Sequence, residues 1–190
     1  MPFPDTFTTS RLKAERLTAA HRPDVQRLHG DPAVMALLGG VRDADQTAAY
    51  LARNLRHWEE YGFGVWILRE RDGADVIGLA VLRHLLIDDV DEVEVGYAFH
   101  PASWGRGLAT EVAQACVGFA RDALHLPSLV ALTHRDNHRS QRVLRKVGLE
   151  YEREIVHEDL PTALFRTLPG WRAAPVRSSV DAPDLLTPRR

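Results

Sequence analysis

The alternation of hydrophobic and polar residues divides the chain into short strands and amphipathic helices. Residues 65–71 and 76–86 are rich in β-branched and aliphatic residues and flank an Asp72-Gly73 turn, which predicts a β-hairpin. Between residues 107 and 123, apolar residues recur at helical spacing. By the same reasoning we expect further strands at 9–17, 91–100, 129–133, 151–157 and 162–168, and further helices at 21–29, 43–60 and 137–147.

The order of these elements predicts the fold class. The first strands follow one another as antiparallel neighbours, and the helix at 107–123 then crosses over to a later strand. This order predicts an α/β (α+β) fold with a mixed, largely antiparallel central sheet of about seven strands, flanked by helices on both faces. Periodicity is lost from Trp171 onward, so we expect one domain over residues 1–170 and a mobile Pro/Arg-rich tail over 171–190.

Composition excludes several classes of function. With a net charge of −2, the chain has no overall positive potential that would attract nucleic acid. No apolar run approaches the roughly 20 residues that span a bilayer, and no signal peptide is visible, so we expect a cytoplasmic protein without membrane contact. Arginine greatly outnumbers lysine, which fits a GC-rich bacterial genome. The sequence leaves monomer and homodimer both open.

The single cysteine and the histidines give no metal site. Cys116 cannot form an intramolecular disulfide, and it falls on the apolar stripe of its helix, which predicts a buried thiol. No His-x-x-x-His or His/carboxylate spacing indicates a metal, and none is expected.

A glycine-rich junction, Trp104-Gly105-Arg106-Gly107-Leu108-Ala109-Thr110, carries the strongest chemical signal. It follows a strand and opens a helix, whose first amides have no carbonyl partner and point toward a bound anion. Residues Gly105, Arg106, Gly107, Leu108, Ala109 and Thr110 are therefore a candidate pyrophosphate cradle built from main chain. A simple tight turn is the alternative, and the Arg106 side chain either reaches a phosphate or is solvated.

Several motifs together resemble the GNAT N-acetyltransferase superfamily over residues 9–168. Gly107 and Ala109 occupy the small positions of that family's Arg/Gln-x-x-Gly-x-Gly/Ala motif for acetyl-CoA. Trp104 in place of the usual Arg or Gln is similar to the Rim-type branch, which includes ribosomal-protein N-terminal acetyltransferases. The other matches to that branch are Thr9-Ser10-Arg11-Leu12, Asp31-Pro32-Ala33-Val34-Met35, Gly96-Tyr97, Pro101, Ala109-Thr110-Glu111, Asn137, Ser140 and Gly148-Leu149.

The resemblance implies a cosubstrate, acetyl-CoA, and several binding roles. In the family, the strand that corresponds to 91–100 splays from its neighbour, and acetyl-CoA inserts there. The main chain of Tyr97 and Phe99 is then expected to hold the pantetheine arm, and Asn137 to hydrogen-bond it. The family's frequent tyrosine acid is missing because Leu144 stands at its position, which points to Ser140 as the hydroxyl near the sulfur. Helix capping is the alternative role for both Asn137 and Ser140.

Glu94 is the first candidate for the base that deprotonates an amine. It shares one face of its strand with Glu92, Gly96 and Ala98. A carboxylate on a covered strand must face a wet cleft or be paired, so a partnership with an arginine is the alternative. His100, His134 and Asp136 lie near the same strand ends and are lesser candidates.

These observations favour an enzyme that moves an acetyl group from acetyl-CoA to a primary amine in a ternary complex. A protein N-terminus, a small amine, an aminoglycoside-like compound and a free amino acid all remain possible acceptors. The alternative from another class is a non-catalytic acyl-CoA-binding sensor or assembly module on the same fold.

Overall fold

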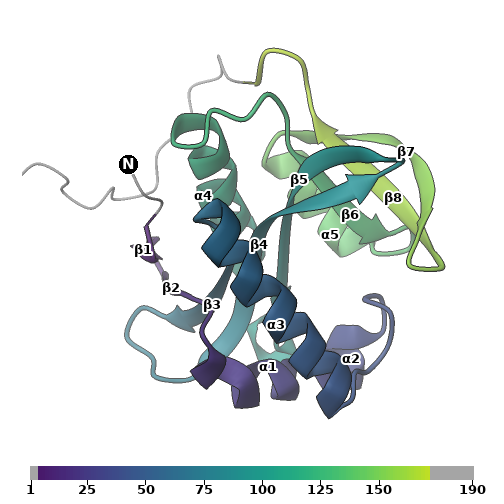
Figure 1. The fold of residues 1–190 in the computed structure, drawn as a ribbon. Coiled ribbons are helices and arrows are strands. Elements are labelled where there is room, and N and C mark those ends of the chain that lie inside the picture. The colour runs from purple at the N-terminus through teal and green to yellow at the C-terminus, as the bar shows by residue number, and fades with distance from the viewer. Residues whose placement is uncertain (1–3, 172–190) are drawn as a thin grey trace, which may run out of the picture.

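The central sheet of the computed structural model, which describes residues 4–171, has eight strands (Figure 1). Their order is β1-β2-β3-β4-β5-β6-β8-β7, and every neighbouring pair is antiparallel apart from β5 and β6. The strands are β1 Thr6–Thr8, β2 Leu12–Arg16, β3 Val65–Glu70, β4 Val76–Ile87, β5 Val90–Phe99, β6 Val130–His134, β7 Leu149–His157 and β8 Leu160–Thr167. The mixed, largely antiparallel sheet is thus confirmed.

One strand more than the expected seven arises at the N-terminus. The predicted strand 9–17 is shorter than expected, because a turn closed by a hydrogen bond from the amide of Thr9 to the carbonyl of Leu12 separates β1 from β2. Of the predicted tail, only Trp171 lies within the described residues. Its indole donates a hydrogen bond to the carbonyl oxygen of Pro127 at 2.8 Å.

Helices cover both faces of the sheet, as the sequence predicts. The helices α1 Arg22–His29, α2 Pro32–Met35 and α3 Ala44–Tyr61 pack on one face, while α4 Leu108–Asp122 and α5 His138–Lys146 pack on the other (Figure 1). Short 3₁₀ turns are found at Ala19–His21 and Pro101–Ser103. Within residues 4–171, no helix is long and apolar enough to cross a membrane.

Local signals explain where the helices begin and end. Asp43 and Gln46 form a capping box at the start of α3, and Gly62 ends that helix in the left-handed conformation, with φ of 73°. Helix α2 was not expected, because Asp31-Pro32 reads as a break. Instead, the Asp31 carboxylate accepts hydrogen bonds from the amides of Ala33 and Val34 and starts a helical turn there.

The parallel strands β5 and β6 diverge, which opens the sheet. They share a single register pair, Glu94 with Val130, whereas β5 pairs with β4 along its whole length. Beyond Glu94, the edge of β5 therefore has no strand beside it on the β6 side. This is the splayed central pair that the resemblance implied, and it positions the site described next.

Candidate functional site

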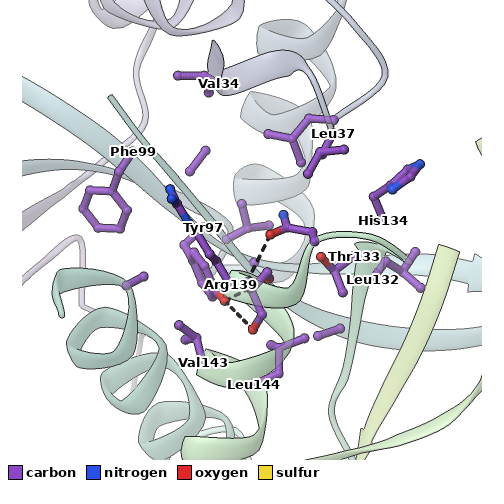
Figure 2. A pocket seen from close by; sticks show the side chains of 18 of the residues that line it. Val34, Leu37, Tyr97, Phe99, Leu132, Thr133, His134, Arg139, Val143 and Leu144 are labelled. Atoms are coloured by element: carbon purple, nitrogen blue, oxygen red, sulfur yellow. Dashed lines mark hydrogen bonds between the residues drawn. The ribbon is translucent and has the colours of Figure 1, made fainter. Parts of the chain in front are cut away.

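A cavity of about 1260 Å³ lies along the gap between β5 and β6 (Figure 2). Its walls come from residues 94–99 of β5, residues 131–134 of β6, the start of α4, and α5. The far end is closed by the segment that contains α2 and by Tyr50 of α3. The cavity is large enough for an extended cosubstrate arm and a second, small reactant.

The glycine-rich junction forms one end of this cavity. Gly107 is the N-cap of α4 and has φ of 79°, a conformation that favours glycine, and no side chain caps the helix there. The first helical hydrogen bond runs from the amide of Glu111 to the carbonyl of Gly107, so the preceding amides are free of helical partners. Gly105, Gly107, Leu108, Ala109 and Thr110 all line the cavity. The structure therefore brings these predicted cradle residues together.

Arg106 differs from its neighbours in the junction. Its guanidinium forms an exposed ion pair with Glu70, with N–O distances of 2.7 and 3.2 Å, and the residue is not part of the cavity wall. A contact between Arg106 and a phosphate would require this exposed ion pair to open, and that contact stays a prediction.

A network behind the junction fixes its backbone. The Glu111 carboxylate accepts hydrogen bonds from the Thr9 hydroxyl (2.5 Å), the Arg11 amide (2.8 Å) and the Arg11 Nε (2.7 Å). Arg11 Nη1 in turn donates to the carbonyl oxygen of Arg106 at 2.7 Å. In a trans peptide the N–H points opposite to the C=O, so the amide of Gly107 points away from Arg11.

Sequence reasoning missed this network. In the sequence, Glu111 is simply an acidic residue in the first turn of a helix, which the helix dipole favours without any further partner. Thr9 and Arg11 stood out in the sequence only as part of the resemblance. Contacts between positions about 100 residues apart leave no periodic signal in one sequence.

Main-chain amides of β5 also face the gap. Just after β5, the amide of His100 donates to the carbonyl of Ile77 in β4, so this amide points toward β4. Because amides alternate in direction along a strand, those of Tyr97 and Phe99 point away from β4, toward the open side. The carbonyl of Phe99 accepts a hydrogen bond from the indole of Trp104 at 2.7 Å, which ties the junction to the end of β5.

Tyr97, which is labelled in Figure 2, meets Ser140 and Asn137 on one wall of the cavity. The Asn137 side chain caps α5 by accepting from the Ser140 amide at 3.1 Å, so the capping role is confirmed for Asn137. The Ser140 hydroxyl lies 3.0 Å from the Tyr97 hydroxyl. Burial raises the pKa of Tyr97 to about 12, partly offset by its hydrogen bond to Ser140, so the phenol is a donor at neutral pH. Leu144 is buried in the core.

Glu94 lies on the other face of β5 from Tyr97, and it is both paired and at the cavity. Its carboxylate accepts a hydrogen bond from Arg83 Nε at 2.5 Å, and the residue is 8% exposed. Burial lowers the pKa of Arg83, but the ion pair with Glu94, together with nearby Tyr50 and Glu158, outweighs burial and raises the pKa. The arginine partnership expected as the alternative is present, and the carboxylate also lines the cavity.

Two of the three lesser candidates for the base lie at the cavity. His134 and Asp136 line the cavity, whereas His100 is not part of its wall. His29, which the sequence did not single out, lines the cavity beside Arg42, and burial together with that arginine lowers its pKa to about 4.

Cys116 is buried, and burial raises the pKa of its thiol to about 12. Over residues 4–171, no group of three His, Cys, Asp or Glu side chains is arranged to hold a metal.

Comparisons with known proteins agree with this geometry. Residues 11–150 match the family model "Acetyltransferase (GNAT) domain". The chain is 30% identical over 138 residues to the uncharacterized protein YkkB of Bacillus subtilis (strain 168), covering 73% of this chain and 80% of that protein.

Two solved structures share the fold. An acetyltransferase from Agrobacterium tumefaciens str. C58 has 25% identity and a TM-score of 0.77, with 88% of this chain and 96% of that chain covered. RimL, a ribosomal L7/L12 α-N-protein acetyltransferase in complex with coenzyme A, has 15% identity and a TM-score of 0.70, with 86% and 98% covered.

Proposed function

The chain belongs to the GNAT family of acetyltransferases, and from this site we propose that it transfers an acetyl group from acetyl-CoA to a primary amine. The observation that carries the proposal is the opening between β5 and β6, with the uncapped start of α4 at the same cavity. This arrangement offers free main-chain donors to a pyrophosphate and to an extended amide-bearing arm, so it fits the chemistry of CoA.

The binding roles follow from where the donors lie. Amides from Gly105 to Thr110 hold the pyrophosphate, and those of Tyr97 and Phe99 hold the pantetheine arm and polarise the thioester carbonyl. Asn137 offers its remaining polar atoms to the same arm while it caps α5. The junction glycines permit close approach of a ligand to the backbone.

The chemical step uses a proton acceptor and is helped by a proton donor, and the candidates for these roles lie on opposite faces of β5. The amine nitrogen attacks the thioester carbon, the C–N bond forms, and the C–S bond then breaks to release the CoA thiolate. Glu94, directly or through a water, takes the proton that the amine loses. Ser140 donates a hydrogen bond or a proton to the departing sulfur, and the Tyr97 hydroxyl, which donates to the Ser140 carbonyl and lies 3.0 Å from the Ser140 hydroxyl, holds that residue in place.

The finer assignment is to the Rim-type branch, whose acceptors include protein N-termini. Trp104 at the junction and Ser140 after Asn137 support it, and RimL is among the structures of the same fold. A non-catalytic acyl-CoA sensor stays the second candidate, because Arg83 already occupies an oxygen of Glu94 and so weakens it as a base.

Turnover with an acceptor panel tests the proposal. Purified protein is incubated with acetyl-CoA and with peptides, small amines or amino acids, and CoA release is followed with a thiol reagent. Because Cys116 is buried, the released CoA dominates the thiol signal. We expect acceptor-dependent release with an equal amount of acetylated amine. Tight binding of acetyl-CoA without release in any acceptor would instead indicate the sensor.

A further inference from the structure

Arg42 is a half-buried cation at the end of the cavity that α2 and Tyr50 close, which we call the acceptor end. Within residues 4–171, no carboxylate lies within 4 Å of its guanidinium. The guanidinium carbon lies 5.5 Å from the centre of the Tyr50 ring. Nη1 lies 3.4 Å from Nε2 of His29. Because the pKa of His29 is lowered to about 4, that imidazole is neutral, and its Nε2 can accept a hydrogen bond from Arg42 but offers no negative charge.

A second arginine in the same wall is only partly satisfied. Arg83 uses Nε for Glu94, while its buried Nη1 has no hydrogen-bond partner. The Glu94 carboxylate is therefore engaged by Arg83, while Glu158, which also lines the cavity, acts on both arginines from more than 4 Å away. Burial lowers the pKa of Arg42, and nearby Arg53 and Arg83 lower it further, although Tyr50 and Glu158 act in the opposite direction.

Taken together, this wall holds guanidinium N–H groups that lack an anionic partner in the part of the chain that the structure describes: Arg42 has no carboxylate within 4 Å, and Arg83 keeps one nitrogen without a hydrogen bond. A buried charge is costly unless it is paired, and an unmade hydrogen bond from a guanidinium adds to that cost. An anionic group bound between the two arginines would accept hydrogen bonds from these N–H groups.

We propose that Arg42 and Arg83 form a subsite for the carboxylate of the acceptor, which is a small primary amine that also carries a carboxylate, as amino acids do. This inference rests on the proposed acetyl transfer and narrows its acceptor. Arg42 binds the carboxylate, and Arg83 contributes its unpaired nitrogen after a small shift of its side chain. The amine then lies toward Glu94, beside the gap that receives the thioester.

Matched acceptors test the charge preference. We would compare kcat/KM for phenylalanine and phenethylamine, and for leucine and isoamylamine, which differ only in the carboxylate. The test variant is Arg42→Gln, with Arg42→Lys to keep the charge. The control is Arg53→Gln, because Arg53 is also placed over the Tyr50 ring, at 5.9 Å, but is exposed and does not line the cavity.

In the wild type we expect the carboxylate to raise kcat/KM by about tenfold or more, the size expected for hydrogen bonds to a charged group. Arg42→Gln abolishes this preference, Arg42→Lys keeps part of it, and Arg53→Gln leaves it intact. Equal use of both members of each pair by the wild type overturns the proposal, as does a better rate with peptides or polyamines than with any free amino acid.

A binding measurement separates this proposal from the failure of acetyl transfer. Calorimetry with N-acetylphenylalanine and with its amide, in the presence of CoA, requires no turnover. Tighter binding of the carboxylate than of the amide, lost in Arg42→Gln, supports the subsite even if no amine is acetylated. Equal binding of the two compounds contradicts the subsite whether or not the protein is an acetyltransferase.

Discussion

Replacing Glu111 by alanine is predicted to loosen the cradle from behind. The change removes three hydrogen bonds, from the Thr9 hydroxyl and from the amide and Nε of Arg11. It leaves Arg11 without the carboxylate that holds it against the Arg106 carbonyl. We therefore expect losses in both stability and affinity for acetyl-CoA.

The size of the stability loss follows from the burial of each partner. Thr9 is buried, so its bond to a charged acceptor is worth about 1.5–3 kcal/mol. The Arg11 side chain is 50% exposed, and water replaces the carboxylate there at a cost of about 1 kcal/mol or less. The sum is about 2–4 kcal/mol, which lowers the unfolding midpoint by roughly 5–15 °C for a domain of this size.

Thermal unfolding and calorimetry with acetyl-CoA measure the two effects. Asp122→Ala is the control, since Asp122 pairs with Arg121 near the other end of α4 and is largely exposed. We expect that control to change stability by less than about 1 kcal/mol and to leave the affinity unchanged. If Glu111→Ala behaves like Asp122→Ala in both assays, the network does not position the cradle.

The same variant has a signature in pH. Burial raises the pKa of Glu111, but the hydrogen bonds from Thr9 and Arg11 outweigh burial and lower it. A carboxylate with a lowered folded-state pKa contributes stability above its unfolded pKa and loses it as the pH falls through the folded value. The difference between wild type and Glu111→Ala should therefore shrink below about pH 4.5.

Three further predictions concern the cavity. Ser140→Ala should lower kcat about tenfold, which corresponds to about 1.4 kcal/mol, with little change in acetyl-CoA affinity, and Tyr97→Phe should lower kcat less. An unchanged kcat in Ser140→Ala would show that Ser140 has no catalytic role. Glu94→Gln should lower the rate by about 10²-fold or more, most strongly at low pH, where the amine is protonated; a pH–rate profile like the wild type's would remove Glu94 from the mechanism. His29 has a pKa of about 4 in the folded protein, so the stability should fall as the pH drops from about 6.5 to 4, because only the unfolded chain takes up the proton there. His29→Gln should make the stability less dependent on pH in this range. An unchanged pH dependence contradicts the lowered pKa of His29.

The sequence predicts most of the fold because the strands and helices carry local, periodic signals. The hairpin at Asp72-Gly73 and the apolar stripe of α4 are both predicted correctly from neighbouring residues. Helix α2 escaped prediction, since a proline after aspartate is compatible with both a break and a helix start.

The site is harder to predict, because its decisive contacts join distant residues. The parity of β5 correctly requires Glu94 to be paired or to face a cleft, yet nothing local identifies Arg83 as its partner. In the same way, Tyr97 was expected to act through its main chain alone, while its hydroxyl meets Ser140 from another element. The arrangement of Arg42 and Arg83 around the cavity brings together separate segments of the chain and leaves no local pattern in the sequence.

Binding of acetyl-CoA to the start of α4 is the claim on which the account depends most. Calorimetric titration of the wild type, Gly107→Ala and Gly107→Glu measures it directly. Both substitutions strain the backbone, where φ is 79°, but only glutamate adds a negative charge at the position assigned to the pyrophosphate. We predict clear binding to the wild type, a modest loss in Gly107→Ala and a much larger loss in folded Gly107→Glu. Equal affinity in the two folded variants, or no binding to the wild type, would contradict the cradle.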